Sequence, residues 1–235
     1  MKSIGLLAFL LLFSGTSSSA VSSLEFSDSG SPNMSITLGL LKEVYKRIGI
    51  TVTSKILPAK RALIESSEGR TDGEINRVFR VGEVYPTLKR IPTSIGRNEA
   101  VVFSKQFNFT VTDCAALRKY KIAITRGNVF ATNCAKGLDF HMLKGATEIL
   151  FFIEYGRADI TIANKLNFLH SMKKSGVSSI HPLSPPLAIV PMYHYLHEKH
   201  RELIPKVDEV LRKMTESGEL DRLRKKLTEE FLGSI

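Results

Sequence analysis

The sequence has no apolar run long enough to cross a membrane as a helix. Among its 235 residues the longest uninterrupted apolar run is Ile4–Phe13, about half of the roughly 20 residues that a bilayer requires. Internal repeats, low-complexity segments and linkers rich in Pro, Gly or Ser are also missing. With 43% hydrophobic and 24% charged residues, the composition is that of an ordinary globular protein. We therefore expect neither an integral membrane protein nor a disordered chain.

Motifs of common enzyme classes are absent as well. There is no Gly-x-Ser-x-Gly nucleophile elbow and no phosphate-binding loop. The histidines at 194, 197 and 200 recur every three residues, which on a helix spreads them over about 120° and does not aim them at one ion. The sequence thus predicts no enzyme activity, no metal and no cofactor.

The balance of charge is strongly basic, with a net charge of +10. The basic residues are spread along the chain, and the tightest cluster, at 222–226, alternates with apolar residues. A nucleic-acid partner is not expected, because the chain has no aromatic ladder and no glycine-rich basic tract to grip single strands. A solvated basic surface is the simpler interpretation.

The N-terminus has the three regions of an export signal. Lys2 gives a positive start, residues 4–13 an apolar stretch, and residues 18–20 the small-residue pattern before a cleavage point. We expect residues 1–20 to be removed and the mature chain to start near Val21 in the periplasm. The alternative is a disordered N-terminal tail.

The chain has only two cysteines, Cys114 and Cys134. An exported chain meets an oxidising compartment, in which a single pair of thiols favours a disulfide. The bridge would close a loop of about 20 residues and stabilise the fold by roughly 3 kcal/mol. The alternative is two separate buried thiols.

Helical and strand patterns alternate along the mature chain. A helix is predicted over 35–48, where apolar residues recur at helical spacing before Gly49, followed by a strand over 50–57 and a helix from Pro58 to Gly69. The later expected elements are strands at 121–125, 159–163 and 179–183 and helices at 128–135, 147–155, 166–174, 203–218 and 220–231. This order predicts an α/β protein with a mostly parallel sheet. Such sheets bind ligands beyond the carboxyl ends of their strands.

The order of several short motifs resembles the periplasmic solute-binding proteins of the amino-acid type, known as family 3. They are GLLKEVYKRIG from residue 39, LPAKRAL from 57, GRTDGE from 69, GRAD from 156, and PP at 185 with YLHEKH from 195. The resemblance covers nearly the whole mature chain and implies the type II periplasmic-binding fold. In it, two α/β lobes close on a small molecule between them.

The resemblance also implies how the chain is divided. Lobe 1 would be residues 21–99 and 192–235, lobe 2 residues 105–187, and the hinge crossovers 100–104 and 188–191. The implied function is capture of a small polar or anionic, amino-acid-like solute by a monomer that delivers it to a membrane permease of an ABC-type importer. The alternatives are a sensory protein that acts on a receptor or histidine kinase, and an exported enzyme on the same scaffold.

Arg77 is the candidate ligand residue of the first lobe, since it ends a predicted strand near the place where such lobes carry an arginine for the ligand carboxylate. A guanidinium suits this role because its fork gives two parallel charge-assisted hydrogen bonds. The alternative is an arginine paired with Glu74.

The candidates of the second lobe are Arg126, Gly127 and Asn128, at the start of a helix where free backbone N–H groups favour an anion, and Asn164. Many amino-acid binders have an acid at the position of Asn164 to pair with the ligand's ammonium. An asparagine keeps the hydrogen-bond acceptor but not the charge, so we expect carboxylates without an α-ammonium to bind better than standard amino acids. The alternative for Asn128 and Asn164 is a helix-capping role.

Overall fold

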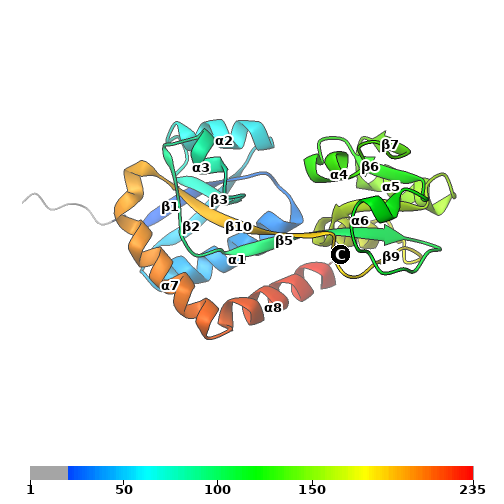
Figure 1. The fold of residues 1–235 in the computed structure, drawn as a ribbon. Coiled ribbons are helices and arrows are strands. Elements are labelled where there is room, and N and C mark those ends of the chain that lie inside the picture. The colour runs from blue at the N-terminus through cyan, green and yellow to red at the C-terminus, as the bar shows by residue number, and fades with distance from the viewer. Residues whose placement is uncertain (1–20, 235) are drawn as a thin grey trace, which may run out of the picture.

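Ten strands form one continuous sheet in the computed structural model, which describes residues 21–234. The strand order is β2-β1-β3-β10-β5-β8-β6-β7, with β4 at the side of β10 and β9 at the side of β5. Figure 1 shows that the two ends of this sheet belong to two separate lobes, which the long strands β5 and β10 connect. The α/β fold class is confirmed, but the sheet is mixed and not mostly parallel, because β5 and β10 pair antiparallel with all their neighbours. The predicted export signal lies outside the described residues.

The first part of the chain consists of β1 (Ser23–Asp28), α1 (Pro32–Lys46), β2 (Thr51–Ile56), α2 (Ala59–Ser67), β3 (Gly73–Arg77), α3 (Val81–Val84), β4 (Leu88–Arg90) and β5 (Gly96–Ser104). The middle part consists of η1 (Ala115–Leu117), β6 (Ile122–Thr125), α4 (Val129–Cys134), β7 (Phe140–Leu143), α5 (Ala146–Glu154), β8 (Ile160–Asn164), α6 (Lys165–Lys174) and β9 (His181–Pro182). The last part consists of β10 (Ala188–His197), η2 (Glu198–Leu203), α7 (Ile204–Glu216) and α8 (Glu219–Gly233). We call β1–β4 with α1–α3, α7 and α8 the first lobe, and β6–β9 with α4–α6 the second lobe.

Helix α1 begins three residues earlier than its apolar pattern predicts. Ser31 caps it by accepting a hydrogen bond from the Met34 backbone N–H, and Pro32 occupies the first helical position, where its missing N–H costs nothing. The buried face of α1 then packs on one apolar core of the first lobe, together with α7 and the inner face of the sheet. This core includes Phe26, Leu40, Leu41, Val44, Tyr45, Ile75, Leu196, Val207 and Leu211.

The second lobe has a core on each face of its sheet. Val102 belongs to one cluster, with β6 and α4, and Val101 and Phe103 belong to the other, with α5 and α6. Side chains alternate between the two faces of a strand, so this half of β5 is buried on both sides. Residues 100–104, expected as a crossover, pair with β8 inside the sheet of the second lobe.

The two lobes meet where β5 and β10 run antiparallel. Gly96–Ala100 of β5 pairs with Ala188–Met192 of β10, whereas the far half of β10 pairs with β3 and β4 in the first lobe. Two strands are therefore shared between the lobes at this point. A short two-strand connection of this kind is a place where lobes can rotate relative to each other.

Helix α8 begins in the first lobe and reaches the second. It runs along the lower edge of the view in Figure 1, beneath α1 and toward α6. Near its middle Leu227 lies against Gly39 of α1. At its end the Phe231 ring stacks on His170 of α6, with ring centroids 5.2 Å apart, and Lys173 donates to the Leu232 carbonyl. The helix thus passes the strand connection on its lower side.

The predicted disulfide between Cys114 and Cys134 is confirmed, with Cα atoms 5.3 Å apart. It joins the residue before η1 to the last residue of α4.

The histidines at 194 and 197 lie on β10 and His200 in η2, so the helical geometry assumed for them is wrong. None of the helices within residues 21–234 combines the length and apolar character needed to cross a bilayer.

Candidate ligand-binding cleft

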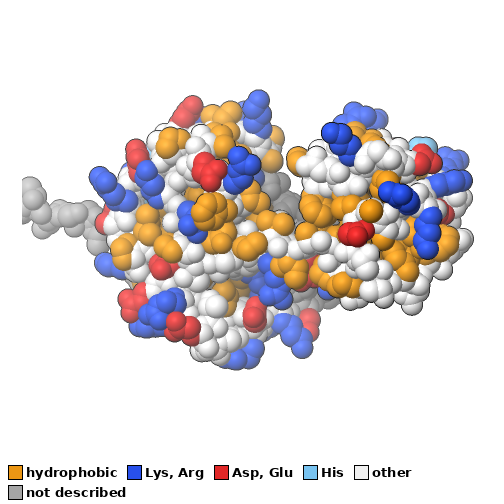
Figure 2. All heavy atoms as spheres, viewed as in Figure 1, with side chains coloured by type: hydrophobic (Ala, Val, Ile, Leu, Met, Phe, Trp, Pro, Cys, Tyr) orange, Lys and Arg blue, Asp and Glu red, His pale blue; other side chains and the backbone are white. Residues whose placement is uncertain are grey.

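A cavity of about 290 Å³ lies where both lobes meet. Most of its lining comes from the first lobe, while Asn167 comes from α6 of the second and Asn98 from the strand connection. Its polar side chains are Ser29, Ser31, Asn33, Asn76, Arg77, Asn98 and Asn167. Figure 2 shows a notch in the surface between the two lobes, on the side opposite α8. We call the cavity of about 290 Å³ the cleft cavity.

The cleft cavity lies at the carboxyl ends of the parallel strands of the first lobe. Asn76 and Arg77 are the last two residues of β3, and Ser29 and Ser31 follow β1 directly. Side chains from neighbouring strand ends converge at this edge of an open α/β sheet. Arg77 therefore lies at the strand end where the sequence pattern predicts it.

Asparagine amides connect the walls of the cleft cavity. Asn33 Nδ2 donates to Asn98 Oδ1 at 2.6 Å, and the Asn33 backbone N–H donates to Asn167 Oδ1 at 3.4 Å. Asn76 Nδ2 donates to the Thr37 hydroxyl at 2.7 Å. One polar network thus spans α1, the strand connection and the second lobe.

The Arg77 guanidinium forms an ion pair with the buried carboxylate of Glu74. Its Nε donates to Glu74 Oε2 at 2.8 Å, and Ser66 donates to the other carboxylate oxygen at 2.7 Å. Burial raises the pKa of Glu74, and the Arg77 charge opposes that rise. This is the pairing named above as the alternative to a ligand role. Yet Nη1 of Arg77 finds no hydrogen-bond acceptor among residues 21–234, so one edge of the guanidinium is left for a ligand.

The predicted second-lobe residues lie at the turn between β6 and α4. Arg126 and Gly127 are exposed, and Gly127 has the left-handed φ of 85° that only glycine adopts without strain. Asn128 caps α4, because its Oδ1 accepts from the Ala131 N–H at 3.1 Å. The three do not line the cleft cavity with Arg77. Their ligand role stays a prediction.

Asn164 also caps a helix, and it lies in a different cavity. Its Oδ1 accepts from the Asn167 N–H at 3.1 Å, while its side chain lines a space of about 190 Å³ together with Arg97 and Glu99. Asn167, one turn further along α6, lines the cleft cavity instead. The structure therefore does not bring Arg77 and Asn164 into one cavity.

The amides that do line the cleft, at positions 33, 76, 98 and 167, were missed. Asn76 directly precedes Arg77 at the same strand end, which is a signal that could have been used. Asn98 and Asn167 carry no comparable signal, because only the pairing of β5 with β10 and the docking of α6 bring them to α1.

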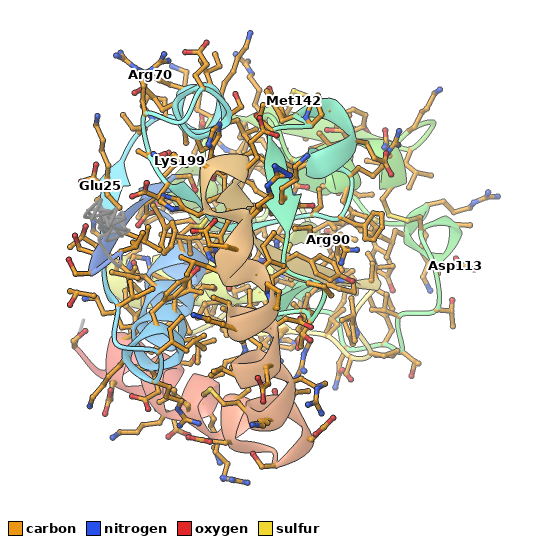
Figure 3. The ribbon with its side chains drawn as sticks, turned by 90° about the vertical axis from the view of Figure 1, so that its left-hand side faces the viewer. Glu25, Arg70, Arg90, Asp113, Met142 and Lys199 are labelled. Carbon is orange, nitrogen blue, oxygen red and sulfur yellow. A yellow bond between two sulfur atoms is a disulfide. The ribbon has the colours of Figure 1, made fainter. Side chains whose placement is uncertain are left out.

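Aromatic side chains hold a neighbouring arginine on the first lobe. The guanidinium carbon of Arg90 lies 4.2 Å from the ring centre of Phe79 and 4.5 Å from that of Tyr193, and the labelled Arg90 is visible in Figure 3. Cation–π contacts of this kind are worth about 0.5–1 kcal/mol at exposed sites. Arg90 is thus held outside the cleft cavity, and Arg77 is the only charged residue of the described chain that lines it.

No family model matches this sequence. The L-cystine-binding protein TcyA of Bacillus subtilis is 26% identical over 192 residues, which are 80% of this chain and 69% of that one. Among solved structures, the probable amino-acid ABC transporter extracellular-binding protein ytmK from Bacillus subtilis superimposes with a TM-score of 0.74 at 17% identity, over 88% of this chain and 97% of that one. The chain has the two-lobe fold of the periplasmic solute-binding proteins.

The predicted resemblance to the amino-acid-type proteins of family 3 is thereby confirmed. A histidine kinase sensor domain with similarity to periplasmic binding proteins also shares the binding-protein fold, with a TM-score of 0.67 at 14% identity over 88% of this chain and 96% of that one. The fold is thus common to a transport-type protein and a sensor. The choice between those roles depends on the partner and not on the fold.

Proposed function

We propose that the protein captures a small polar or anionic, amino-acid-like solute in the cleft cavity and delivers it to an ABC-type importer. The observation that carries this proposal is the unpaired Nη1 edge of Arg77 among the cleft amides of Asn33, Asn98 and Asn167. A guanidinium edge binds a carboxylate, and neutral amides supply both donors and acceptors for the rest of a polar ligand. The names of TcyA and ytmK support the same class of solute.

Binding would be completed by rotation of the second lobe. The strands Gly96–Ala100 and Ala188–Met192 form the proposed hinge, shifted on β5 from the expected residues 100–104. Closure would bring the β6–α4 turn, with Arg126, Gly127 and Asn128, over the solute held by Arg77. A ligand that contacts both lobes stabilises the closed form by its extra affinity for that form.

A sensory role is the second candidate, which the kinase sensor domain with this fold favours. In that case the closed form acts on a receptor or histidine kinase, and nothing is transported. We further propose that the protein works in the periplasm as a monomer without enzymatic activity. The two roles can be distinguished by identifying the membrane partner. Cells grown with the ligand would be crosslinked, and the protein that co-purifies would be either a permease or a sensor.

The proposed site is tested by calorimetry on the protein without residues 1–20. Ligand pairs that differ only in the α-ammonium, such as glutarate and L-glutamate, would be compared with L-cystine. We expect the carboxylate without the ammonium to bind more tightly than its amino-acid counterpart, because no carboxylate of the described residues lines the cleft cavity to pair with an ammonium. Asn167→Ala should weaken binding of the best ligand at least tenfold, or about 1.4 kcal/mol. It removes the second-lobe amide that lines the cleft cavity and contacts Asn33 of the first lobe.

The matched control is Asn133→Ala, which changes an asparagine of the second lobe that does not line the cleft cavity. Its affinity should equal that of the unmodified protein. Equal binding by the Asn167→Ala and Asn133→Ala proteins would show that the solute binds elsewhere.

A further inference from the structure

A second cavity lies on the other face of the strand connection. Along β5 the side chain of Asn98 lines the cleft cavity, whereas those of Arg97 and Glu99 line the space of about 190 Å³. Alternation along a strand places these neighbours on opposite faces. The far wall of this space is formed by α8, through Arg224 and Thr228. We call it the hinge cavity, and the proposed function makes no use of it.

The charges around the hinge cavity do not balance. The carboxylate of Glu99 is shared by Arg97, at 3.3 Å, and Lys165, at 3.2 Å. Asp221, which is largely exposed, lies 3.8 Å from Arg97. Arg224 has no carboxylate within ion-pair distance in the described part of the chain. Three cations thus face two carboxylates, and one of these points into solvent.

Arg224 is held in place by the backbone of the strand connection. It donates to the Ile95 carbonyl, and its guanidinium packs so closely on Gly96 that a Cβ atom there would overlap it. Burial lowers the pKa of Arg224 and the nearby charge of Arg97 lowers it further, against a smaller opposing effect of Asp221. Its surroundings therefore oppose the positive charge, which a bound anion would relieve.

Three apolar side chains line the hinge cavity beside the polar side chains of Asn33, Asn164 and Lys165. They are Ile36 of α1 and Leu166 and Leu169 of α6. The volume is several times the share of one water molecule, about 30 Å³, so the space can hold a small organic group. An inorganic anion would satisfy the arginine but leave these apolar side chains uncovered.

We propose that the hinge cavity binds a short-chain aliphatic carboxylate. Its carboxylate group is held by Arg224 and Arg97, and its chain lies against Ile36, Leu166 and Leu169. The walls come from α1 and α8 of the first lobe and α6 of the second. A ligand there touches both lobes on the side of the hinge opposite the cleft cavity, so it is a second site, separate from the cleft cavity although Asn33 lines both.

The test is a titration with hexanoate, followed by NMR shifts of backbone amides or by calorimetry. Hexanoate should bind, hexanamide should not because it lacks the charge, and inorganic phosphate should bind at least tenfold more weakly because it lacks the chain. Arg224→Met should weaken hexanoate at least tenfold. Equal affinity for phosphate and hexanoate would overturn the proposal and indicate nonspecific attraction to a basic protein.

The control variant is Arg222→Met on the same helix. Arg222 also donates to a backbone carbonyl, that of Ser217, but does not line the hinge cavity. Its variant should bind hexanoate normally. Thr228→Phe fills the cavity from α8 without removing a charge, so it should abolish binding even if the Arg224 variant folds poorly. Hexanoate binding that survives Thr228→Phe would show that the cavity is not the site.

Discussion

The two lobes are stabilised in different ways. Of the fully or nearly fully buried polar residues in the described chain, all but Ser104 and Thr161 belong to the first lobe or to its half of β10. The second lobe instead has two apolar clusters on the faces of its sheet and a disulfide. Buried polar groups require partners, and a first lobe built from such pairs is sensitive to charge and pH.

The difference suits different roles for the two lobes, one fixed and one moving. The first lobe presents fixed polar groups to the cleft cavity, such as Asn33 and Asn76, each held by hydrogen bonds within that lobe or to the strand connection. The second lobe contributes few buried polar groups and can move as one packed unit. Each of the following changes tests one side of this comparison.

The largest effect is expected from Arg77→Ala. The variant leaves Glu74, whose side chain is fully buried, without its cation, and loss of one partner of a buried pair costs about 3–5 kcal/mol. Urea unfolding measures this loss, and the double variant Glu74→Gln with Arg77→Ala should recover part of it. Arg77→Ala alone is therefore a poor test of ligand binding.

The control for this change is Arg80→Ala, which removes an exposed arginine paired with Glu83 three residues away. An exposed pair contributes at most about 1 kcal/mol. A loss in Arg77→Ala as small as that in Arg80→Ala would mean that Glu74 finds another partner.

The next effect concerns acid and His194. Its Nδ1 lies 2.7 Å from the Glu74 carbonyl, which can only accept, so Nδ1 donates and Nε2 accepts from the Tyr45 hydroxyl at 2.8 Å. Burial lowers the pKa of His194 from 6.5 to about 4. The imidazole in the unfolded chain, with its pKa near 6.5, therefore takes up a proton at a higher pH than the folded protein does. The free energy of unfolding is highest above about pH 6.5 and falls by about 3 kcal/mol as the pH drops toward 4.

Urea unfolding at a series of pH values measures this dependence. His194→Asn removes the titrating group, so the unfolding free energy of the variant should change less between pH 6.5 and 4. The same slope in both proteins would assign the acid sensitivity to other groups.

The second lobe should respond to loss of its disulfide. Cys114→Ala with Cys134→Ala removes a crosslink between residues 20 apart in sequence, worth roughly 3 kcal/mol. Hydrogen exchange should show faster opening of β6 and α4 and little change in β1 and α1. Reductant added to the double variant is the control and should have no further effect. Equal destabilisation of both lobes would show that they unfold together.

The sequence was sufficient for the elements whose signals are local. The helices ended by Gly49, Gly156 and Gly176, the α/β class and the cysteine pair were predicted correctly. The start of α1 was misplaced because Ser31, its cap, precedes the first periodic apolar residue. The strands β4 and β7 were missed, since both are short and interrupted by charged or polar residues, unlike the equally short but mostly apolar β6.

The candidate site was harder to predict, because it depends on pairing between distant segments. Arg77 could be placed from the strand that it ends. Its pairing with Glu74 was one of two open alternatives; the structure shows that pairing with a buried carboxylate, and the ligand role remains a proposal. Asn164, the residue that caps α6, precedes Asn167 by three positions, and only the docking of that helix determines which of them faces the cleft cavity.

The smallest expected effect concerns the contact that joins the lobes through α8. Phe231 stacks on His170 on the side of the hinge opposite the cleft, so rotation that closes the cleft must pull this pair apart. The contact therefore favours the open form. Aromatic pairs are worth about 0.5–1.5 kcal/mol, so Phe231→Ala should raise the affinity for the captured solute by a few-fold up to about tenfold.

Calorimetry measures that affinity, and small-angle scattering should show a more compact protein before ligand is added. The matched control is Phe151→Ala, which removes a ring stacked on Tyr155 within the second lobe, with centroids 6.3 Å apart. Because that pair does not cross the hinge, its loss should leave affinity unchanged. A lower affinity in Phe231→Ala would mean that α8 follows the second lobe during closure, and the lobes would then be coupled and not free to rotate about two strands.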